Sequence, residues 1–175
     1  MKKWKKILIL VIILAILTLL YARFISTRGL KVSEKSIITD KLPEDYDGFK
    51  IVQFTDLHYG STIHLKELKN VVKRINDQNP DIIIFTGDLV ENKVVLSDEE
   101  VEKMETELNK LNPSIEILAV KGNHDYDHDY FDMITEKLNW KVLNNTYEFI
   151  YKDSTIPIVF VGFDDLLRGK VDINN

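Results

Sequence analysis

Cysteine does not occur among the 175 residues of this chain. Its absence excludes disulfide bonds and thiolate chemistry, and it leaves either side of a membrane open as the location. Internal repeats and low-complexity segments are absent as well. A chain of this length with 45% apolar residues can bury one sizeable core but not two, so we expect one main domain.

Basic residues are outnumbered by acidic residues over most of the chain. Four of the 23 Lys and Arg residues precede residue 7, so 19 remain after it against all 28 Asp and Glu residues, a net charge of −9. An acidic body repels the phosphate backbone of nucleic acids. We therefore expect no nucleic-acid partner.

Polar residues are almost missing from residues 7–20, where Thr18 is the only one. The apolar character continues to Ile25 apart from Arg23, and nineteen helical residues would rise about 28 Å, close to the ~30 Å hydrocarbon core of a bilayer. A core helix of a soluble domain is disfavoured because this stretch has no polar face. The segment is predicted to span a membrane once.

The flanks of this segment indicate its orientation. The four lysines before it favour a cytoplasmic N-terminus and a folded body outside the cytoplasm, and Trp4 and Tyr21 stand where interfacial aromatic residues belong. A cleavable signal peptide is the alternative. Cleavage after Ala22 would place Leu20 where a small residue is needed, so we favour an uncleaved anchor in the cell membrane.

The chain divides into three regions by composition. Residues 1–25 form a basic tip and the membrane anchor. Residues 26–48 are more polar and are interpreted as a tether with an edge strand around residues 31–39. Residues 49–175 form the folded domain.

The folded domain alternates short apolar runs with stretches of helical periodicity. Pro80 ends the first helical stretch, and Ser97 with Glu100 has the spacing of a capping box that starts the second. This alternation predicts an α/β fold in which parallel strands are joined by right-handed crossovers. We expect strands at residues 50–55, 81–86 and 114–120, helices at residues 64–79, 97–112 and 129–138, and short strands without helices at residues 147–151 and 156–161.

Side chains that can bind metals follow each of the first three apolar runs. Any one of these stretches alone could be an ordinary turn, because Gly, Asn and Asp are common in turns. The carboxyl ends of neighbouring parallel strands open onto a shared crevice, so we expect the three stretches to meet there. The residues are Asp56 and His58 after the first run, Asp88 after the second, and Asn123, His124 and Asp125 after the third.

This set of ligands has a preferred class of metal. Carboxylate, imidazole and amide groups together favour a borderline divalent ion, manganese, iron or zinc, over calcium. Gly87 and Gly122 each precede a candidate ligand. The missing Cβ at these two positions permits positive φ or a close approach of two backbones.

Three stretches of the chain resemble the first three motifs of the calcineurin-like metallophosphoesterases. They are Asp56-x-His58, Gly87-Asp88 and Gly122-Asn123-His124-Asp125, in that order. The resemblance covers about residues 46–165, and the membrane-anchored bacterial branch of the family is the most similar in layout. It implies a βαβαβ half of a β-sandwich flanked by helices, and hydrolysis of phosphomonoesters or phosphodiesters by a hydroxide that two metal ions activate.

The resemblance also implies a role for each matching residue. Asp56 and His58 would hold the first metal ion, Asp88 would bridge both ions, and Asn123 would bind the second. A phosphoester would be the substrate, and a lipid-linked phosphoester is suggested by the membrane anchor and by the lipid pyrophosphatases of the anchored branch.

Two further roles concern proton transfer. His124 resembles the family's histidine that contacts the substrate phosphate and assists the leaving group. Asp125 would orient the imidazole of His124.

The later motifs of the family, a Gly-His and a Gly-His-x-His, have no counterpart in this chain. The chain has four histidines and none after His128. We expect the other two, His64 and His128, to be solvated side chains. The chain also ends soon after a strand, before the second sheet of the family's sandwich, so we expect an N-terminal fragment of a longer enzyme. The alternative is an inactive fragment, or a membrane-tethered remnant that binds a metal or a phosphate.

Overall fold

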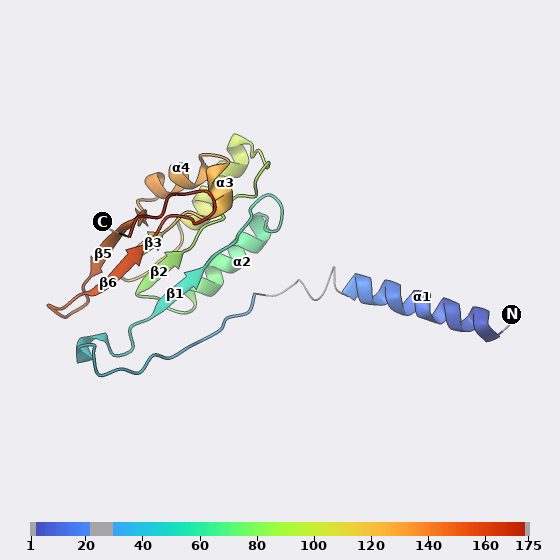
Figure 1. Cartoon of the computed structure of the whole chain (residues 1–175), viewed down its shortest axis with the longest axis horizontal. Coiled ribbons are helices and arrows are strands. Elements are labelled where there is room, and N and C mark those ends of the chain that lie inside the picture. Colours follow the sequence, from blue (N-terminus) through green and yellow to red (C-terminus); the bar gives the residue numbers. More distant parts are fainter. Residues whose placement is uncertain (1–2, 22–29, 174–175) are drawn as a thin grey trace. The chain divides into compact units, whose positions relative to one another are not determined.

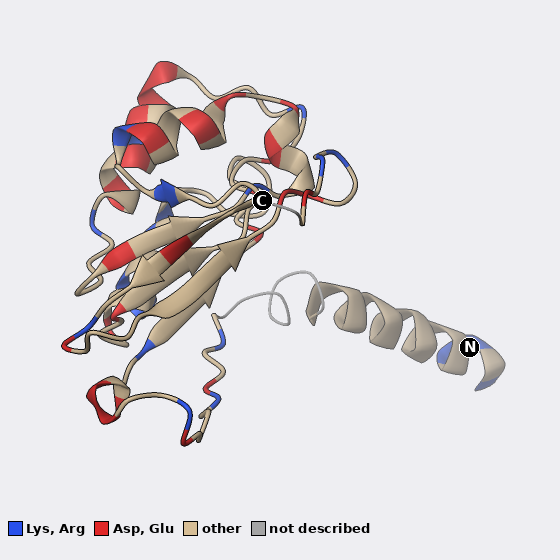
Figure 2. Cartoon of the chain, turned by 60° about the vertical axis from the view of Figure 1, so that its left-hand side comes forward, with Lys and Arg blue, Asp and Glu red and all other residues tan. Residues whose placement is uncertain are grey.

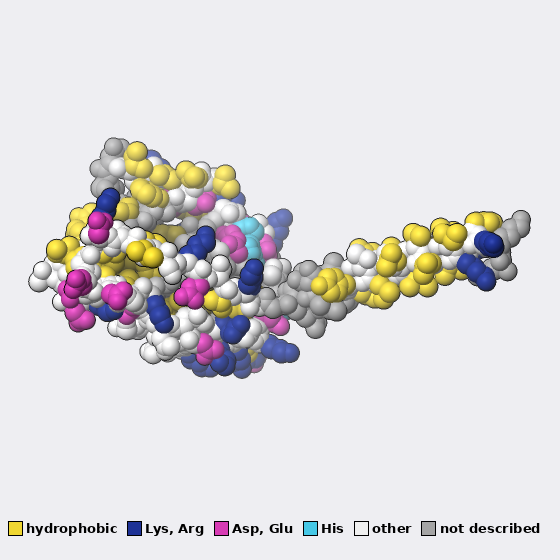
Figure 3. All heavy atoms as spheres, turned by 90° about the horizontal axis from the view of Figure 1, so that it is seen from below, with side chains coloured by type: hydrophobic (Ala, Val, Ile, Leu, Met, Phe, Trp, Pro, Cys, Tyr) yellow, Lys and Arg dark blue, Asp and Glu magenta, His cyan; other side chains and the backbone are white. Residues whose placement is uncertain are grey.

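The computed structural model describes residues 3–21 and 30–173. These residues belong to two units, divided between Ser36 and Ile37. The first unit contains α1 (Lys3–Tyr21), which has no buried residue and is long and apolar enough to cross a membrane. Hydrophobic side chains cover α1 in Figure 3, and the hydroxyl of Thr18 donates to the carbonyl of Leu14 at 2.8 Å. The helix is therefore a candidate membrane span. Residues 22–25 of the predicted anchor lie outside the described residues.

The segment before the folded domain contains no strand within its described part, residues 30–48. The prediction of an edge strand around residues 31–39 was wrong, because these residues pair with no neighbouring strand and Ile37 and Ile38 are almost fully exposed. The segment is attached to the folded domain instead by Tyr46, which lies in η2 (Glu44–Tyr46). The buried hydroxyl of Tyr46 lies 3.1 Å from the carbonyl oxygen of Ile150 and 2.7 Å from that of Ile156.

The second unit is built on a four-stranded sheet in the order β1-β2-β3-β4, in which all neighbours are parallel (Figure 1). Its strands are β1 (Ile51–Phe54), β2 (Ile82–Phe85), β3 (Glu116–Ala119) and β4 (Lys141–Val142). The helices between them are α2 (Leu65–Asn76), α3 (Asp98–Leu108) and α4 (Tyr130–Lys137). An antiparallel hairpin follows, made of β5 (Thr146–Ile150) and β6 (Ile158–Gly162).

The sequence therefore predicted every α-helix of the second unit and every strand except β4, with bounds that differ by a few residues, but neither of the short 3-10 helices η2 and η3 (Asn123–Tyr126). The predicted capping box is present, because the N–H of Ser97 donates to Glu100 Oε2 at 3.1 Å and the N–H of Glu100 donates to Ser97 Oγ at 3.3 Å. Acidic side chains crowd the first turn of α3, where they stabilise the positive end of the helix dipole. Acidic residues are visible along the helices of this unit in Figure 2.

The two faces of the sheet have different covers. Ile83, Phe85 and Ala119 share one hydrophobic cluster with the buried side chains of all three helices. The alternate strand residues Ile82 and Leu118 share a second cluster with residues of the hairpin region. Right-handed crossovers between strands in the order 1-2-3-4 keep every helix on the same face. On the opposite face the hairpin region covers β2 and β3, while Ile51 and Gln53 of β1 stay exposed. The outer apolar side chains of the hairpin are exposed: Tyr147, Phe149, Val159 and Val161.

Candidate metal centre

The loops after β1 and β2 run side by side beyond the ends of the two strands. The N–H of Asp56 donates to the carbonyl of Gly87 at 3.0 Å, and the N–H of His58 donates to the carbonyl of Asp88 at 3.0 Å. These bonds continue the parallel pairing of β1 with β2 into the loops. The predicted convergence at the carboxyl edge of the sheet is therefore found for the first two motifs.

The loops after β2 and β3 touch at two glycines. Gly87 has φ +89°, and a Cβ there would lie 2.0 Å from the backbone nitrogen of Gly122. A Cβ on Gly122 would lie 2.3 Å from Asp88 Oδ1. Such distances are far inside van der Waals contact, so only glycine allows this approach. The close backbone contact that the sequence suggested for Gly87 and Gly122 is confirmed.

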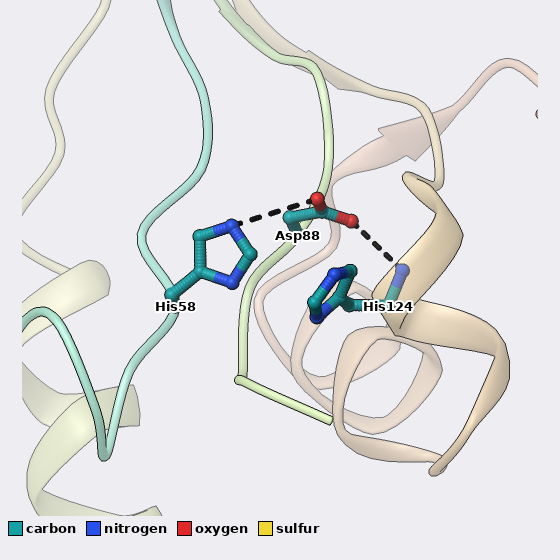
Figure 4. A group of neighbouring side chains, drawn as sticks. All are labelled: His58, Asp88 and His124. Atoms are coloured by element: carbon teal, nitrogen blue, oxygen red, sulfur yellow. Dashed lines mark hydrogen bonds and ion pairs between the residues drawn. The ribbon is translucent and has the colours of Figure 1, made fainter.

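Three of the predicted site residues meet where these loops converge (Figure 4). His58, Asp88 and His124 each offer one ligand atom, and the three atoms lie within 4.8 Å of one another. His58 Nε2 lies 3.6 Å from Asp88 Oδ2 and 3.5 Å from Asp56 Oδ1. Two imidazoles and a carboxylate suit zinc, iron or manganese. The donor set therefore fits a divalent transition metal.

The site is partly open to solvent. The side chains of His58 and His124 are about one-fifth exposed, and that of Asp56 is more than half exposed. Histidine atoms reach the surface beside acidic side chains in Figure 3. A substrate group can therefore reach these residues without a rearrangement of the core.

The backbone is strained at three of the candidate ligands. Asp56, His58 and Asp88 have φ values of 54°, 42° and 60°, in the left-handed region that residues other than glycine seldom adopt. Left-handed residues of this kind cost energy and cluster at functional sites. Each position turns the chain sharply after a strand, which brings the side chain back to the edge of the sheet.

Asp125 connects the loop after β2 with the loop after β3 through hydrogen bonds to their backbone. Its carboxylate is almost fully buried and accepts three backbone N–H groups, from Asp88 at 2.8 Å, Leu89 at 2.9 Å and Gly122 at 3.0 Å. Burial raises the pKa of this carboxyl above its usual value, and the three hydrogen bonds oppose but do not cancel that rise. We expected Asp125 to orient the imidazole of His124. Both of its oxygens are instead engaged by the backbone.

The carboxylate that faces the imidazoles belongs to Glu91, which the sequence reasoning missed. Glu91 Oε1 lies 2.9 Å from His124 Nδ1, and Glu91 Oε2 lies 3.2 Å from His58 Nδ1, although the second pair is not aligned as a hydrogen bond. The two rings meet edge to face with centroids 4.6 Å apart. Glu91 thus contacts the Nδ1 side of both rings and leaves each Nε2 for other partners. The available signal was its position in the same loop as Asp88, three residues on.

Asn123 and His124 lie in η3 (Asn123–Tyr126), a single turn directly after the β3 loop. The backbone N–H of His124 donates to Asp88 Oδ1 at 2.9 Å, which leaves Asp88 Oδ2 on the side of His58. Asn123 is half-buried at the start of this turn. The structure therefore brings the third motif against the second.

The remaining two histidines differ in their surroundings. His64 is exposed at the start of α2, as expected. The expectation of a solvated His128 was wrong. Its ring packs against Tyr130, its Nε2 lies 3.2 Å from the carbonyl oxygen of Val90, and its Nδ1 is buried. The polar run 126–130 folds back onto the loop after β2, which covers this ring.

Comparisons with known proteins agree with this geometry. Residues 49–172 match the calcineurin-like phosphoesterase family. The chain is 32% identical over 155 residues to an uncharacterized metallophosphoesterase of Bacillus subtilis, YkuE, and the match covers 87% of this chain and 54% of that protein. It is 25% identical over 163 residues to a transmembrane protein with a metallophosphoesterase domain from Danio rerio, covering 90% of this chain and 36% of that protein.

A third relative has a named activity. The UDP-2,3-diacylglucosamine pyrophosphatase LpxG of Chlamydia trachomatis is 32% identical over 111 residues, which is 63% of this chain and 33% of that protein. The chain spans about half the length of YkuE and less of the other two. The family match covers well over half of the chain and includes all three motifs. The chain belongs to the calcineurin-like metallophosphoesterase family.

Proposed function

We propose that this chain carries part of the catalytic centre of a metal-dependent phosphoester hydrolase. The observation that supports this most strongly is the meeting of His58, Asp88 and His124, from three separate loops, with side-chain atoms within 4.8 Å of one another. His58 and Asp88 would be ligands, and His124 would be the proton donor beside them. Asp56 Oδ1 lies 3.5 Å from His58 Nε2, and Asn123 directly precedes His124 in η3. We assign Asp56, His58, Asp88 and Asn123 to metal binding.

A bound divalent pair would supply Lewis acidity toward the phosphoryl oxygens and a water of lowered pKa. The chain's own residues would do the rest. His124 Nδ1 can either donate to Glu91 Oε1, which lies 2.9 Å away, or accept the N–H of Asn92 at 3.3 Å. In the second case the ring proton is on Nε2, from which it can pass to the departing oxygen. Asp125 keeps the loops after β2 and β3 in register through the backbone.

We infer that the substrate is an amphiphilic phosphoester or pyrophosphate at the outer surface of the cell membrane. The support is the candidate span α1, the lysines ahead of its apolar part, and the similarity to LpxG, which is named as a pyrophosphatase of a diacylated sugar nucleotide. Manganese, iron and zinc are the ions to test, since each accepts imidazole and carboxylate ligands together.

A second candidate function is binding without catalysis. The chain has no histidine after His128, whereas the resemblance implies three more histidine ligands. A site with only part of its ligands could hold one ion, and a phosphate on it, without hydrolysis. This reading predicts metal binding in the absence of turnover.

The full chain in detergent tests both readings by calorimetry with manganese and by hydrolysis of a nitrophenyl phosphate monoester and diester. We expect manganese binding that Asp88→Asn and Asn123→Ala weaken and that His124→Ala retains. The matched control is Asp77→Asn, an exposed carboxylate that pairs with Lys73 on α2. Hydrolysis that depends on manganese and on Asp88 supports the enzyme, and binding without hydrolysis supports the second reading. If Asp88→Asn binds manganese as tightly as Asp77→Asn, the assigned site is wrong.

A further inference from the structure

The loop that follows β6, residues 163–172, turns its acidic groups inward. Asp164 accepts a hydrogen bond from the hydroxyl of Tyr126, and its oxygens also accept the N–H of Asp165 at 2.9 Å and of Lys170 at 2.8 Å. Asp165 Oδ1 accepts the N–H groups of Leu167 and Arg168 at 2.9 Å and 2.7 Å. The two carboxylates therefore fix the backbone of the loop.

The opposite side of the same loop is apolar and faces solvent. Leu166 is 85% exposed and Leu167 is 80% exposed, the two following each other at the tip. Single exposed leucines are ordinary on protein surfaces, but two adjacent ones held outward by a hydrogen-bonded turn are not. The loop thus exposes two adjacent leucines while its aspartates are half-buried.

The loop is anchored to the element that carries the candidate catalytic residues. Tyr126 belongs to η3, the turn that contains Asn123 and His124, and its hydroxyl donates to Asp164. Arg168 Nη2 lies 2.5 Å from Asp127 Oδ1, directly after η3. The exposed leucines are therefore positioned through the same turn as the candidate site.

We propose that Leu166 and Leu167 form a second membrane contact, which inserts into the lipid surface and holds the site at the bilayer. Two basic residues follow the leucines, Arg168 and Lys170, and both are exposed, with Arg168 also paired with Asp127. An apolar tip with basic neighbours matches a bilayer interface, where leucines enter the acyl region and basic side chains stay at the phosphate level. The chain also carries the candidate span α1, so the same lipid surface is available to it.

The proposal does not rest on hydrolysis, and it adds a contact beyond the anchor. A contact at Leu166 and Leu167 would direct η3 toward the lipid headgroups. A second copy of the chain, or the remainder of the longer enzyme that the sequence analysis expects, is another occupant that could cover these leucines, and the experiment separates the bilayer from both.

The test places a tryptophan at the loop tip of the full chain in vesicles of phosphatidylcholine with some phosphatidylglycerol, with and without lipids that carry a nitroxide quencher on the acyl chain. All variants carry Trp4→Phe, so that the anchor contributes no emission, while Trp140 is buried and serves as the constant background. The reporters are Leu167→Trp and Leu166→Trp, whose exposed positions tolerate the larger ring. The matched control is Ile156→Trp, 60% exposed in the turn between β5 and β6.

We expect the tip reporters to lose most of their emission to the acyl-chain quencher, and Ile156→Trp to lose almost none. Equal quenching at the tip and at residue 156 would overturn the proposal, since it would mean general proximity to the membrane. Unquenched tip reporters would overturn it as well, and cross-linking between copies in that case would identify the second copy as the occupant.

Discussion

The carboxylate of Asp125 offers the sharpest test of how the site is held. Asp125→Asn keeps the size of the side chain and removes its charge. The carbonyl oxygen of Asn can replace Oδ2, which accepts the N–H groups of Asp88 and Gly122. Its amide nitrogen then faces the N–H of Leu89, which Oδ1 accepts at 2.9 Å in the native chain, so two donors oppose each other.

The expected loss follows from these three bonds. A buried N–H left without an acceptor costs about 1–3 kcal/mol, and the two bonds that remain lose the strengthening that a charged acceptor gives, together about 1 kcal/mol more. The pKa of Asp125 is raised by burial, so removal of the charge returns part of this energy. We therefore expect a loss of roughly 2–3 kcal/mol in the free energy of unfolding.

The assay is urea unfolding of the full chain in detergent, followed by the fluorescence of Trp140, which is buried against Phe85. The control is Asp127→Asn, an exposed carboxylate two residues away that forms only a surface pair with Arg168. We expect Asp127→Asn to change the stability by less than about 1 kcal/mol. Equal effects of the two substitutions would refute the argument that Asp125 joins the loops.

Two further predictions concern other carboxylates. Burial raises the pKa of Asp81, but hydrogen bonds from the N–H of Lys50 and the hydroxyl of Ser114 outweigh this effect, so the pKa is lowered overall. Because the pKa of the folded state lies below that of the unfolded state, Asp81 stabilises the fold above about pH 4. The stability lost in Asp81→Asn should therefore shrink as the pH falls below that value. Glu91→Gln removes the charge that faces both imidazoles and should weaken manganese binding about 10–100-fold in calorimetry, whereas Glu102→Gln on the exposed face of α3 should not. A constant difference for Asp81→Asn, or unchanged affinity for Glu91→Gln, would contradict these assignments.

The elements that the sequence predicted well are those with strong periodicity. Continuous apolar runs marked β2 and β3, and the capping box at Ser97 marked the start of α3. β4 was missed because a two-residue strand has no periodicity to detect. Residues 31–39 contain strand-forming residues, yet a strand needs a partner with free backbone groups, and the sequence of one segment cannot show whether a partner exists.

The sequence predicted which residues lie at the candidate site better than it predicted which of them contact one another. The three motifs were found, and the structure brings His58, Asp88 and His124 together. Asp125 was given the wrong contact because it follows His124 directly in the sequence. In a tight turn successive side chains point in different directions, so His124 faces the site while Asp125 points into the protein. The nearest carboxylate in space, Glu91, comes from another loop.

The backbone strain at the candidate site indicates which interactions hold the candidate ligands in place. Asp56, His58 and Asp88 are all left-handed, and at 1–2 kcal/mol each they cost on the order of 3–6 kcal/mol together. The N–H groups of Asp56 and His58 are both used in pairing with the loop after β2, and the N–H of Asp88 is held by Asp125. The energy cost of these left-handed conformations is therefore offset by backbone hydrogen bonds and by the contact of Gly87 with Gly122. These interactions all lie within the chain, so the fold itself contributes to the positions of the candidate ligands.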